Sequence, residues 1–245
     1  MNIRRKNLKF VKSFSGSPIG CRGNMAKKKE DPKIRKVSPV DDGVPINCRM
    51  TRFEKFVKRA IDVSLSGLLM VLFSPLYLLC YAAVKREDGG PAIYRQERIG
   101  KDGKPFDILK FRSMKLDAEK SGPQLFTDDD PRLTKIGKIL RDHHLDELPQ
   151  LLNVFKGDMA FIGPRPERKY YIDKIMERDS RYKYLYHIRP GVTSYATLYN
   201  GYTDTLDKMV TRLHYDLYYM QHGSPAFDLK ILWLTFCSIV GGKKI

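Results

Sequence analysis

The stretch that decides the fold reads VSLSGLLMVLFSPLYLLCYAAV and spans residues 63–84. It is the only run of 22 residues in the chain without a charged side chain, and about 20 apolar residues suffice for a helix to cross a bilayer. In its middle stands Ser74-Pro75, where the missing N–H and the proline ring disrupt the hydrogen bonds of a helix. We therefore predict two helical halves that meet at a break inside a membrane.

The flanks of this run favour a re-entrant helix pair over a membrane span. Each half has only ten or eleven residues, which at about 1.5 Å per residue reach only part of the way through a hydrocarbon core roughly 30 Å thick. Basic residues on both sides of the run keep both ends in the cytoplasm by the positive-inside rule. They are Lys55, Lys58 and Arg59 before it, and Lys85 and Arg86 after it. A kinked transmembrane helix fits the run alone equally well, but it would export a domain that lacks a disulfide pattern.

The charge of the chain calls for an anionic partner. The 245 residues include 45 Lys and Arg against 28 Asp and Glu, a formal net charge of +17. Phosphate, nucleic acid and acidic lipid all fit this charge. A basic nucleic-acid-binding protein would explain the charge but not the apolar run, so we expect no nucleic acid partner. We expect an anionic membrane surface and substrate phosphates instead.

We divide the chain into three parts. Residues 1–50 have no sustained hydrophobic period and no secretory signal, and are predicted to form a basic, disordered tail. Residues 51–88 are expected to hold the re-entrant helix pair with its flanks. Residues 89–245 are expected to form a compact cytosolic or interfacial catalytic domain. The predicted fold class is α+β, mainly helical, with a small β-hairpin and amphipathic interfacial helices.

Elements of the catalytic domain follow from period and turn signals. Segments 92–99 and 104–114 flank Gly100-Lys-Asp-Gly103, a turn sequence of the hairpin type, and are predicted to pair as strands. Past Pro131 the period becomes helical, with one apolar and one basic side. The apolar side holds Leu133, Ile136, Ile139 and Leu140, and the basic side holds Arg132, Lys135, Lys138 and Arg141. For the C-terminal stretch 226–240 we expect an interfacial helix, with an ordinary core helix as the alternative.

Two adjacent carboxylates, Asp146 and Glu147, stand just ahead of Pro149. Proline belongs in the first turn of a helix, where its missing N–H costs nothing, so both acids are predicted at a helix start. The free N–H groups there keep a carboxylate ionised and also attract phosphate. One acid could attack a phosphorus while the other holds Mg²⁺, which proteins bind through one or two carboxylates and the phosphates of a substrate. A plain N-terminal cap is the structural alternative.

The motif Gly163-Pro-Arg-Pro166 supplies a cation. Its Arg165 is held between two prolines, which preorganises the guanidinium for forked contact with a phosphate. A structural ion pair with a carboxylate is the alternative. The nearby Asp146 and Glu147 favour phosphate binding.

Together these motifs resemble those of the monotopic phosphoglycosyl transferases, the bacterial sugar transferase family. The resemblance covers roughly residues 52–245 and rests on motifs that occur in the order of the family. They are Lys58-Arg-Ala-Ile-Asp62, Ser74-Pro75, Tyr94-Arg-Gln-Glu-Arg-Ile-Gly100, Lys110-Phe-Arg-Ser-Met114, Arg141 followed by Leu145-Asp-Glu-Leu-Pro-Gln-Leu-Leu-Asn-Val154, and Gly163-Pro-Arg-Pro166.

The resemblance implies a re-entrant helix broken at Ser74 and Pro75, in the bacterial inner (cytoplasmic) membrane with the catalytic domain on the cytoplasmic face. It implies transfer of a phosphosugar from a UDP-sugar to polyprenyl (undecaprenyl) phosphate with release of UMP, which initiates glycoconjugate or polysaccharide synthesis, with Mg²⁺ as cofactor. Carried over by position, Asp146 is the nucleophile that forms an aspartyl-phosphosugar intermediate, and Glu147 is the magnesium ligand. The residues expected to bind substrate are Arg141, Arg165, Lys110 and Arg112.

The chain departs from the family pattern at two places. His143-His144 stands where small hydroxyl residues commonly precede Leu-Asp-Glu, and because adjacent helical residues face different ways we expect no two-histidine metal site. The tyrosine-bearing stretch 191–201 also differs, so it is a candidate for setting sugar or lipid specificity. A rival function is a lipid-phosphate hydrolase that uses Asp146 with water as the second acceptor.

Overall fold

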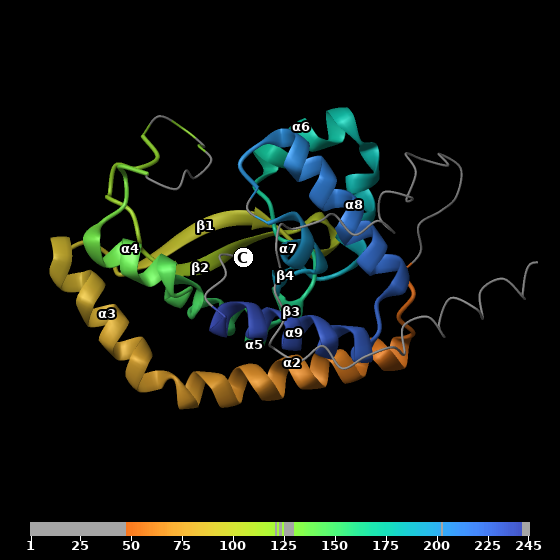
Figure 1. Ribbon diagram of the computed structural model, residues 1–245, viewed down its shortest axis with the longest axis horizontal. Helices are drawn as coiled ribbons and strands as arrows, with labels where there is room; N and C mark the ends of the chain where they lie inside the picture. Colours follow the sequence, from red (N-terminus) through yellow and green to blue (C-terminus); the bar gives the residue numbers. More distant parts are fainter. Residues whose placement is uncertain (1–47, 121, 123, 125–129, 202, 242–245) are drawn as a thin grey trace, which may run out of the picture.

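The computed structural model describes residues 48–120, 122, 124, 130–201 and 203–241. Within these residues the chain is mainly helical with two small two-stranded sheets, which confirms the helical content and the small sheet of the predicted class. A long bent helix pair runs along the base of the molecule, and the hairpin and most other helices lie above it (Figure 1).

The apolar run forms two helices that meet at the predicted break. α2 spans Arg52–Leu72 and α3 spans Ser74–Asp88. Pro75 lies in the first turn of α3, and the hydroxyl of Ser74 donates a hydrogen bond to the carbonyl oxygen of Val71 at 2.8 Å. The two axes are bent by 64°. Among the described residues no single helix is long and apolar enough to cross a membrane, whereas this bent pair taken together is.

Both helices are longer than the expected halves because they continue into the charged flanks. α2 opens with a capping box in which Thr51 and Glu54 bond reciprocally. Farther along, Asp62 is buried and accepts a hydrogen bond from the backbone N–H of Phe161 at 3.1 Å. Buried acceptors are costly unless satisfied, so this bond holds α2 on the rest of the domain. α2 accordingly packs against α5 (Gln150–Lys156), α9 (Pro225–Val240) and β3 (Ala160–Ile162).

The predicted hairpin is confirmed. β1 (Ile93–Ile99) pairs antiparallel with β2 (Pro105–Phe111), and a 3-10 turn, η2 (Lys101–Gly103), joins them. The second strand ends three residues earlier than the predicted segment because Met114 leaves the ladder and forms an isolated bridge with Leu133.

A second, parallel strand pair was not predicted. β3 (Ala160–Ile162) pairs with β4 (Gly191–Thr193), and each has only three residues, too few to give a recognisable period. The backbones approach closely beyond β3, where a Cβ on Gly163 would lie 2.3 Å from the carbonyl oxygen of Arg189. Only glycine fits there, and this fixes the start of the loop that carries Arg165.

α4 (Lys135–Asp142) confirms the helix predicted past Pro131, but its apolar side is narrower than expected. Leu140 is 3% exposed, whereas Ile139, which shares the predicted apolar side, is 54% exposed. The helix contacts the end of β2 through Gly137, where a Cβ would lie 2.0 Å from the carbonyl oxygen of Ser113. That close approach sets which residues face inward.

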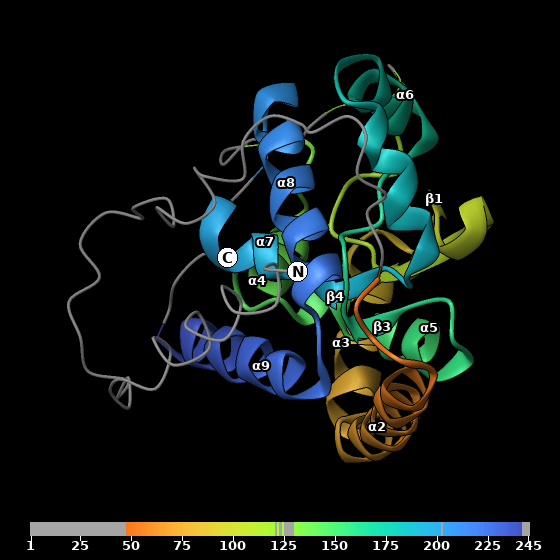
Figure 2. The ribbon, with the colours of Figure 1, turned by 90° about the vertical axis from the view of Figure 1, so that its right-hand side faces the viewer.

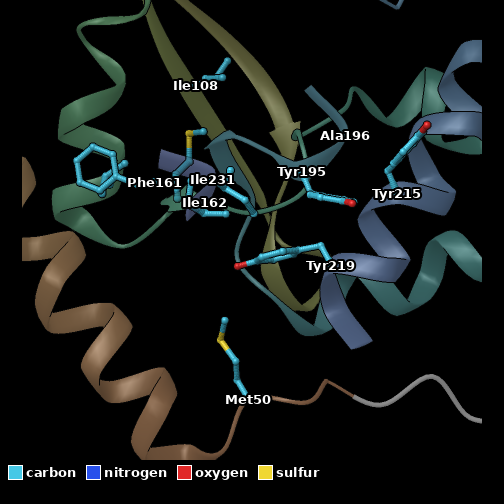
Figure 3. Packing of buried hydrophobic residues seen from close by; sticks show 11 residues of the cluster. Met50, Ile108, Phe161, Ile162, Tyr195, Ala196, Tyr215, Tyr219 and Ile231 are labelled. Atoms are coloured by element: carbon cyan, nitrogen blue, oxygen red, sulfur yellow. The ribbon is translucent and has the colours of Figure 1, made fainter. Parts of the chain in front are cut away.

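Seven more elements complete the part of the domain that the structure describes. They are η3 (Leu145–Glu147), α5 (Gln150–Lys156), α6 (Lys169–Arg178), η4 (Ser180–His187), α7 (Tyr195–Asn200), α8 (Leu206–His222) and α9 (Pro225–Val240). Side chains from β3, α7, α8 and α9 converge in the central apolar cluster (Figure 3). A second cluster joins α6, η4 and α8, and a third joins α3, β2 and α4.

α9 combines the two alternatives considered for the C-terminal stretch. Ile231 is 1% exposed and belongs to the central cluster, whereas Trp233 and Phe236 are each more than half exposed. α9 and α5 lie to either side of α2 (Figure 2), and α5 exposes Leu152 and Phe155. The base of the molecule therefore presents large apolar side chains from three neighbouring helices.

Most of the predicted tail, residues 1–47, lies outside the described residues. Its last three residues do not behave as a tail. The backbone N–H of Arg49 donates to the carbonyl oxygen of Met220 at 3.1 Å, and Met50 is 8% exposed in the central cluster. An apolar side chain just ahead of α2 thus packs into the core.

Candidate active site

Asp146 and Glu147 lie in a 3-10 turn of their own, η3 (Leu145–Glu147), immediately before α5. His144 begins this turn in the left-handed conformation with φ of 55°, and Pro149 is the N-cap of α5. The prediction of a helix start is therefore correct in location, although the proline precedes the helix instead of occupying its first turn. Asp146 is 4% exposed, and the side chain of Glu147 is 22% exposed.

Three cations from different elements surround the two carboxylates. Lys110 on β2 donates a hydrogen bond from Nζ to Oε1 of Glu147 at 2.7 Å. Arg165, in the loop after β3, brings its Nη2 to 3.9 Å from the same oxygen. Arg141, near the end of α4, has its Nε 3.9 Å from Oδ2 of Asp146. These five residues form the dyad site, and all five were predicted from the sequence to react with the substrate or to bind it.

The pKa of Asp146 shifts in the direction opposite to that expected of a carboxylate held ionised by a helix start. Burial raises the pKa of Asp146 above its ordinary value, and the neighbouring charge of Glu147 adds to the rise, while Lys110 and Arg141 oppose it. Desolvation wins because a carboxylate that is almost fully removed from water loses more hydration than the cations restore. The carboxylate of Asp146 is thus less stabilised as an anion, a property suited to a nucleophile.

Glu147 lies in the same turn but responds in the opposite direction. Burial raises its pKa, but the charges of Lys110 and Arg165 and the hydrogen bond from Lys110 outweigh this and lower it to about 2. Glu147 is therefore a permanent anion at neutral pH. Two neighbouring acids with opposite pKa shifts are typical of sites in which the acids have different tasks.

Asn153 positions α5, and the sequence-based reasoning missed it. Its side-chain oxygen accepts from the backbone N–H of Leu109 at 3.0 Å, and its amide donates to the carbonyl oxygen of Asp107 at 2.8 Å. Both partners belong to β2, so the bonds fix the dyad turn beside Lys110. The available signal was a single amide within the apolar run Leu151-Leu-Asn-Val154.

A buried ion network behind Arg165 was also missed. Glu167 accepts hydrogen bonds from Arg212 at 2.9 Å and from Arg98 at 3.4 Å. Burial lowers the pKa of both of these arginines while Glu167 opposes the fall, and the charge of Arg165 lowers both further. Arg165 therefore lies close to two other guanidinium groups, in a field that favours an additional anion. In the sequence, the one signal of this network was Glu167, which directly follows Arg165-Pro166.

Arg112, Ser74 and Pro75 lie apart from the five residues. Arg112 forms a forked pair with Asp88 at the end of α3, with one donor distance of 2.9 Å, so it joins the residue after β2 to α3. Its assignment to substrate binding stays a prediction. His143 is exposed and its Nδ1 lies 2.9 Å from the carbonyl oxygen of Ile139, and within the described residues no three His, Cys, Asp or Glu side chains gather as a metal site.

The donor set nevertheless fits the kind of magnesium site that shares its ligands with a substrate. Mg²⁺ requires oxygen ligands and usually takes one or two carboxylates plus phosphate oxygens and water. Glu147 supplies an ionised and partly exposed carboxylate next to Asp146. A substrate diphosphate would supply the remaining oxygens.

A profile of the bacterial sugar transferase family matches residues 53–242, and the chain belongs to this family. It is 38% identical over 187 residues to the UDP-N-acetylgalactosamine-undecaprenyl-phosphate N-acetylgalactosaminephosphotransferase of Aeromonas hydrophila. The matched residues make up 76% of this chain and 44% of that protein. It is 39% identical over 200 residues to the UDP-glucose:undecaprenyl-phosphate glucose-1-phosphate transferase of Escherichia coli strain K12. The matched residues make up 79% of this chain and 43% of that protein.

A similar relative from Caulobacter vibrioides, also a UDP-glucose:undecaprenyl-phosphate glucose-1-phosphate transferase, is 42% identical over 187 residues, covering 75% of this chain and 69% of that protein. The chain spans less than half the length of the Aeromonas and Escherichia proteins. The relatives share a lipid acceptor in their names but differ in the sugar.

Proposed function

We propose that the chain is a Mg²⁺-dependent phosphoglycosyl transferase that moves a sugar 1-phosphate from a UDP-sugar to undecaprenyl phosphate and releases UMP. The observation that carries this proposal is the buried Asp146 next to an ionised Glu147, with Lys110, Arg141 and Arg165 around them. Such a site neutralises a diphosphate while presenting one carboxylate to it. The family membership and the names of the relatives support the same reaction class.

In the first step, a carboxylate oxygen of Asp146 attacks the β-phosphorus of the UDP-sugar. The bond between that phosphorus and the bridging oxygen breaks, UMP leaves with the bridging oxygen, and an aspartyl-phosphosugar remains. Arg141 and Arg165 neutralise the charge on the phosphoryl oxygens, and the preorganised loop of Arg165 limits the entropy lost on binding. Mg²⁺, held by Glu147 and the diphosphate, supplies Lewis acidity when bound.

In the second step, a phosphate oxygen of undecaprenyl phosphate attacks the phosphorus of the aspartyl-phosphosugar. The bond to Asp146 breaks, its carboxylate is regenerated, and the sugar leaves on an undecaprenyl diphosphate. Because one carboxylate serves both steps, UMP leaves before the acceptor reacts, which is a ping-pong sequence. A product of this kind would begin the synthesis of a glycoconjugate or polysaccharide.

We propose that the bent pair enters the bacterial cytoplasmic membrane and returns, with the domain on the cytoplasmic face. The exposed apolar side chains of α2, α5 and α9 support contact of the whole base with lipid, because large apolar patches on a protein surface mark such contacts. A kinked span is the competing topology. In a cysteine-free background, Arg52→Cys and Asp102→Cys should label from the same side of the membrane, and labelling from opposite sides would refute the re-entrant pair.

The activity test uses detergent-solubilised protein, Mg²⁺, undecaprenyl phosphate and separate UDP-sugars, including UDP-glucose, UDP-galactose and UDP-N-acetylgalactosamine. We expect UMP release and a lipid-linked sugar with at least one donor, both of which chelation should stop. Absence of product with every donor would sink the proposal.

The intermediate is tested by withholding the lipid acceptor. A donor labelled in the β-phosphate should then label wild-type protein, whereas Asp146→Asn should stay unlabelled. A lipid-phosphate hydrolase that uses the same carboxylate would leave the labelled donor intact under these conditions and would release inorganic phosphate once undecaprenyl phosphate is added, so the two functions give different products.

A further inference from the structure

A cavity of about 180 Å³ lies away from the dyad site, between the beginning of α2 and the end of α8. Its inner wall is mainly apolar and includes Met50, Ile162 and Tyr219. Figure 3 shows these three side chains on the flank of the central cluster that faces α2. The space is smaller than the ~300–1,000 Å³ of pockets that hold drug-sized ligands, so it suits a small group and not a whole sugar nucleotide.

Basic side chains from three separate parts of the chain also line the cavity. Those with a permanent charge are Lys55, Lys58, Arg59, Lys101 and Arg189, and His187 lies beside them. Asp62 is the one carboxylate among the residues that line this cavity, and it already accepts the backbone N–H of Phe161. We call this space the basic cavity. Its charge balance favours an anion.

Two of the five cations are held in place by backbone oxygens. Arg59 donates to the carbonyl oxygens of Val154 and Phe155 at 2.6 and 2.8 Å, and Arg189 donates to the carbonyl oxygen of Gly157 at 2.9 Å. A carbonyl oxygen orients a guanidinium but carries no full negative charge. Fixed charges of this kind cost little further ordering when an anion arrives.

The other three cations divide into one paired and two exposed groups. Lys58 forms an ion pair with Asp228, which places it in the wall. Lys55 and Lys101 are exposed, and Lys101 makes only a loose contact of 3.8 Å with the exposed Asp102. These two long side chains can therefore close over a group that enters between them.

The basic cavity shares α2 with the exposed apolar side chains at the base of the molecule. Phe53 and Phe56, in the first turns of α2, are 73% and 70% exposed. Exposed aromatic rings on a helix that also carries basic residues are typical of the membrane interface, where phosphates of lipids lie. An apolar inner wall next to a cationic rim matches a phosphate attached to a short apolar substituent.

We propose that the basic cavity binds a phosphate-bearing anion at a site distinct from the dyad site. The group can come from the head of an anionic phospholipid or from free phosphate, since both present the same oxygens to the same cations. Binding there would hold α2 on the domain at the level of the membrane surface, whatever sugar the dyad site transfers.

The test measures binding by the full chain in detergent at about 150 mM salt, which screens long-range attraction between exposed charges. The probes are inorganic phosphate, short-chain phosphatidylglycerol and short-chain phosphatidylcholine, the lipids below their critical micelle concentrations. A ligand that binds only the folded protein stabilises it by RT ln(1 + [L]/Kd), so the dependence of the melting temperature on ligand concentration gives an apparent Kd. We expect a concentration-dependent rise with phosphatidylglycerol, phosphate or both, and a weaker one with zwitterionic phosphatidylcholine.

The matched variants are Lys55→Gln/Lys101→Gln and Arg52→Gln/Lys104→Gln. Both remove two exposed charges from the same helix end and the same hairpin turn, but only the first pair lines the basic cavity. We expect the first to weaken the apparent Kd about tenfold, which corresponds to 1.4 kcal/mol, and the second to change it less than about twofold.

The response to the three probes identifies the source. A rise with phosphatidylglycerol alone assigns the site to a lipid, and an equal rise with phosphate assigns it to the free anion. The proposal is overturned if no probe gives a concentration-dependent rise, if the first variant binds as the wild type does, or if both variants lose binding equally. None of these readouts depends on transferase activity.

Discussion

The two ends of α5 are both contacted by basic side chains, and the acceptors at each end differ. Before its first turn, Lys110 and Arg141 face the carboxylates of Glu147 and Asp146. After its last turn, Arg59 and Arg189 face backbone carbonyl oxygens. The same residue types therefore do different things. At the start of α5 they tune two ionisable acids, and at its end they satisfy a helix terminus that would otherwise lack partners.

The start of α5, which carries Asp146 and Glu147 just before it, therefore contributes less to the folding free energy than the end of α5 does. A buried carboxylate with a raised pKa costs folding free energy when it is ionised, whereas a guanidinium on terminal carbonyls contributes stability. Substitutions at the start of α5 should therefore lower the rate of the reaction with little change in the free energy of unfolding. Substitutions at its end should lower the free energy of unfolding with little change in the rate.

The largest expected effect is at Asp146. Asp146→Asn removes the nucleophile and should lower turnover by about 10³-fold or more. Because its pKa is raised in the folded protein, Asp146 contributes to stability at low pH, and that contribution is lost as pH rises through the raised pKa. The neutral amide should therefore leave the melting temperature at pH 7 unchanged or higher. Steady-state UMP release measures turnover, and thermal unfolding measures the melting temperature. The exposed Asp142→Asn is the control for both.

Glu147→Gln should come next, with a loss of about 10²-fold in turnover, because the neutral amide is a poor magnesium ligand. The variant should also need more Mg²⁺ for half-maximal rate than the wild type. A magnesium titration of UMP release provides the measurement. An unchanged magnesium requirement would remove Glu147 as the ligand.

At the other end of α5, Arg59→Met should destabilise the protein by about 2 kcal/mol, since it removes two charge-assisted hydrogen bonds from the terminal carbonyls. Denaturant unfolding in detergent measures the change, with the exposed Arg52→Met as the control. The acid side of the pH–rate profile should stay where it is in the wild type. A loss of activity without a loss of stability would contradict the division between the two ends.

The smallest expected effect is a displacement of the pH–rate profile in Lys110→Met. The positive charge of Lys110 lowers the pKa of Asp146, so its removal should raise that pKa further. Because the attacking group must be ionised, the rate should begin to fall at a higher pH than in the wild type as the solution is acidified. The profile of kcat/KM measures this, and Lys104→Met, at an exposed position on the same hairpin, should leave it unchanged.

Local signals in the sequence determined much of the fold and of the site. The missing N–H of Pro75 and its steric clash act over a single turn, so the break between α2 and α3 could be predicted. The hairpin followed from its glycine-flanked turn, and the place of Asp146 and Glu147 before α5 followed from Pro149. All of these are decided by neighbours in the chain.

Only the tertiary structure decided which distant groups meet. Lys110 reaches Glu147, while Arg112, just past the end of the same strand, pairs with Asp88 instead. The contact of Arg59 with the end of α5 joins residues 95 positions apart. Packing between elements fixes such contacts, and it also decides which of two adjacent acids is the more deeply buried. The sequence alone placed the two carboxylates, and the burial of Asp146 beside three cations made them different from each other.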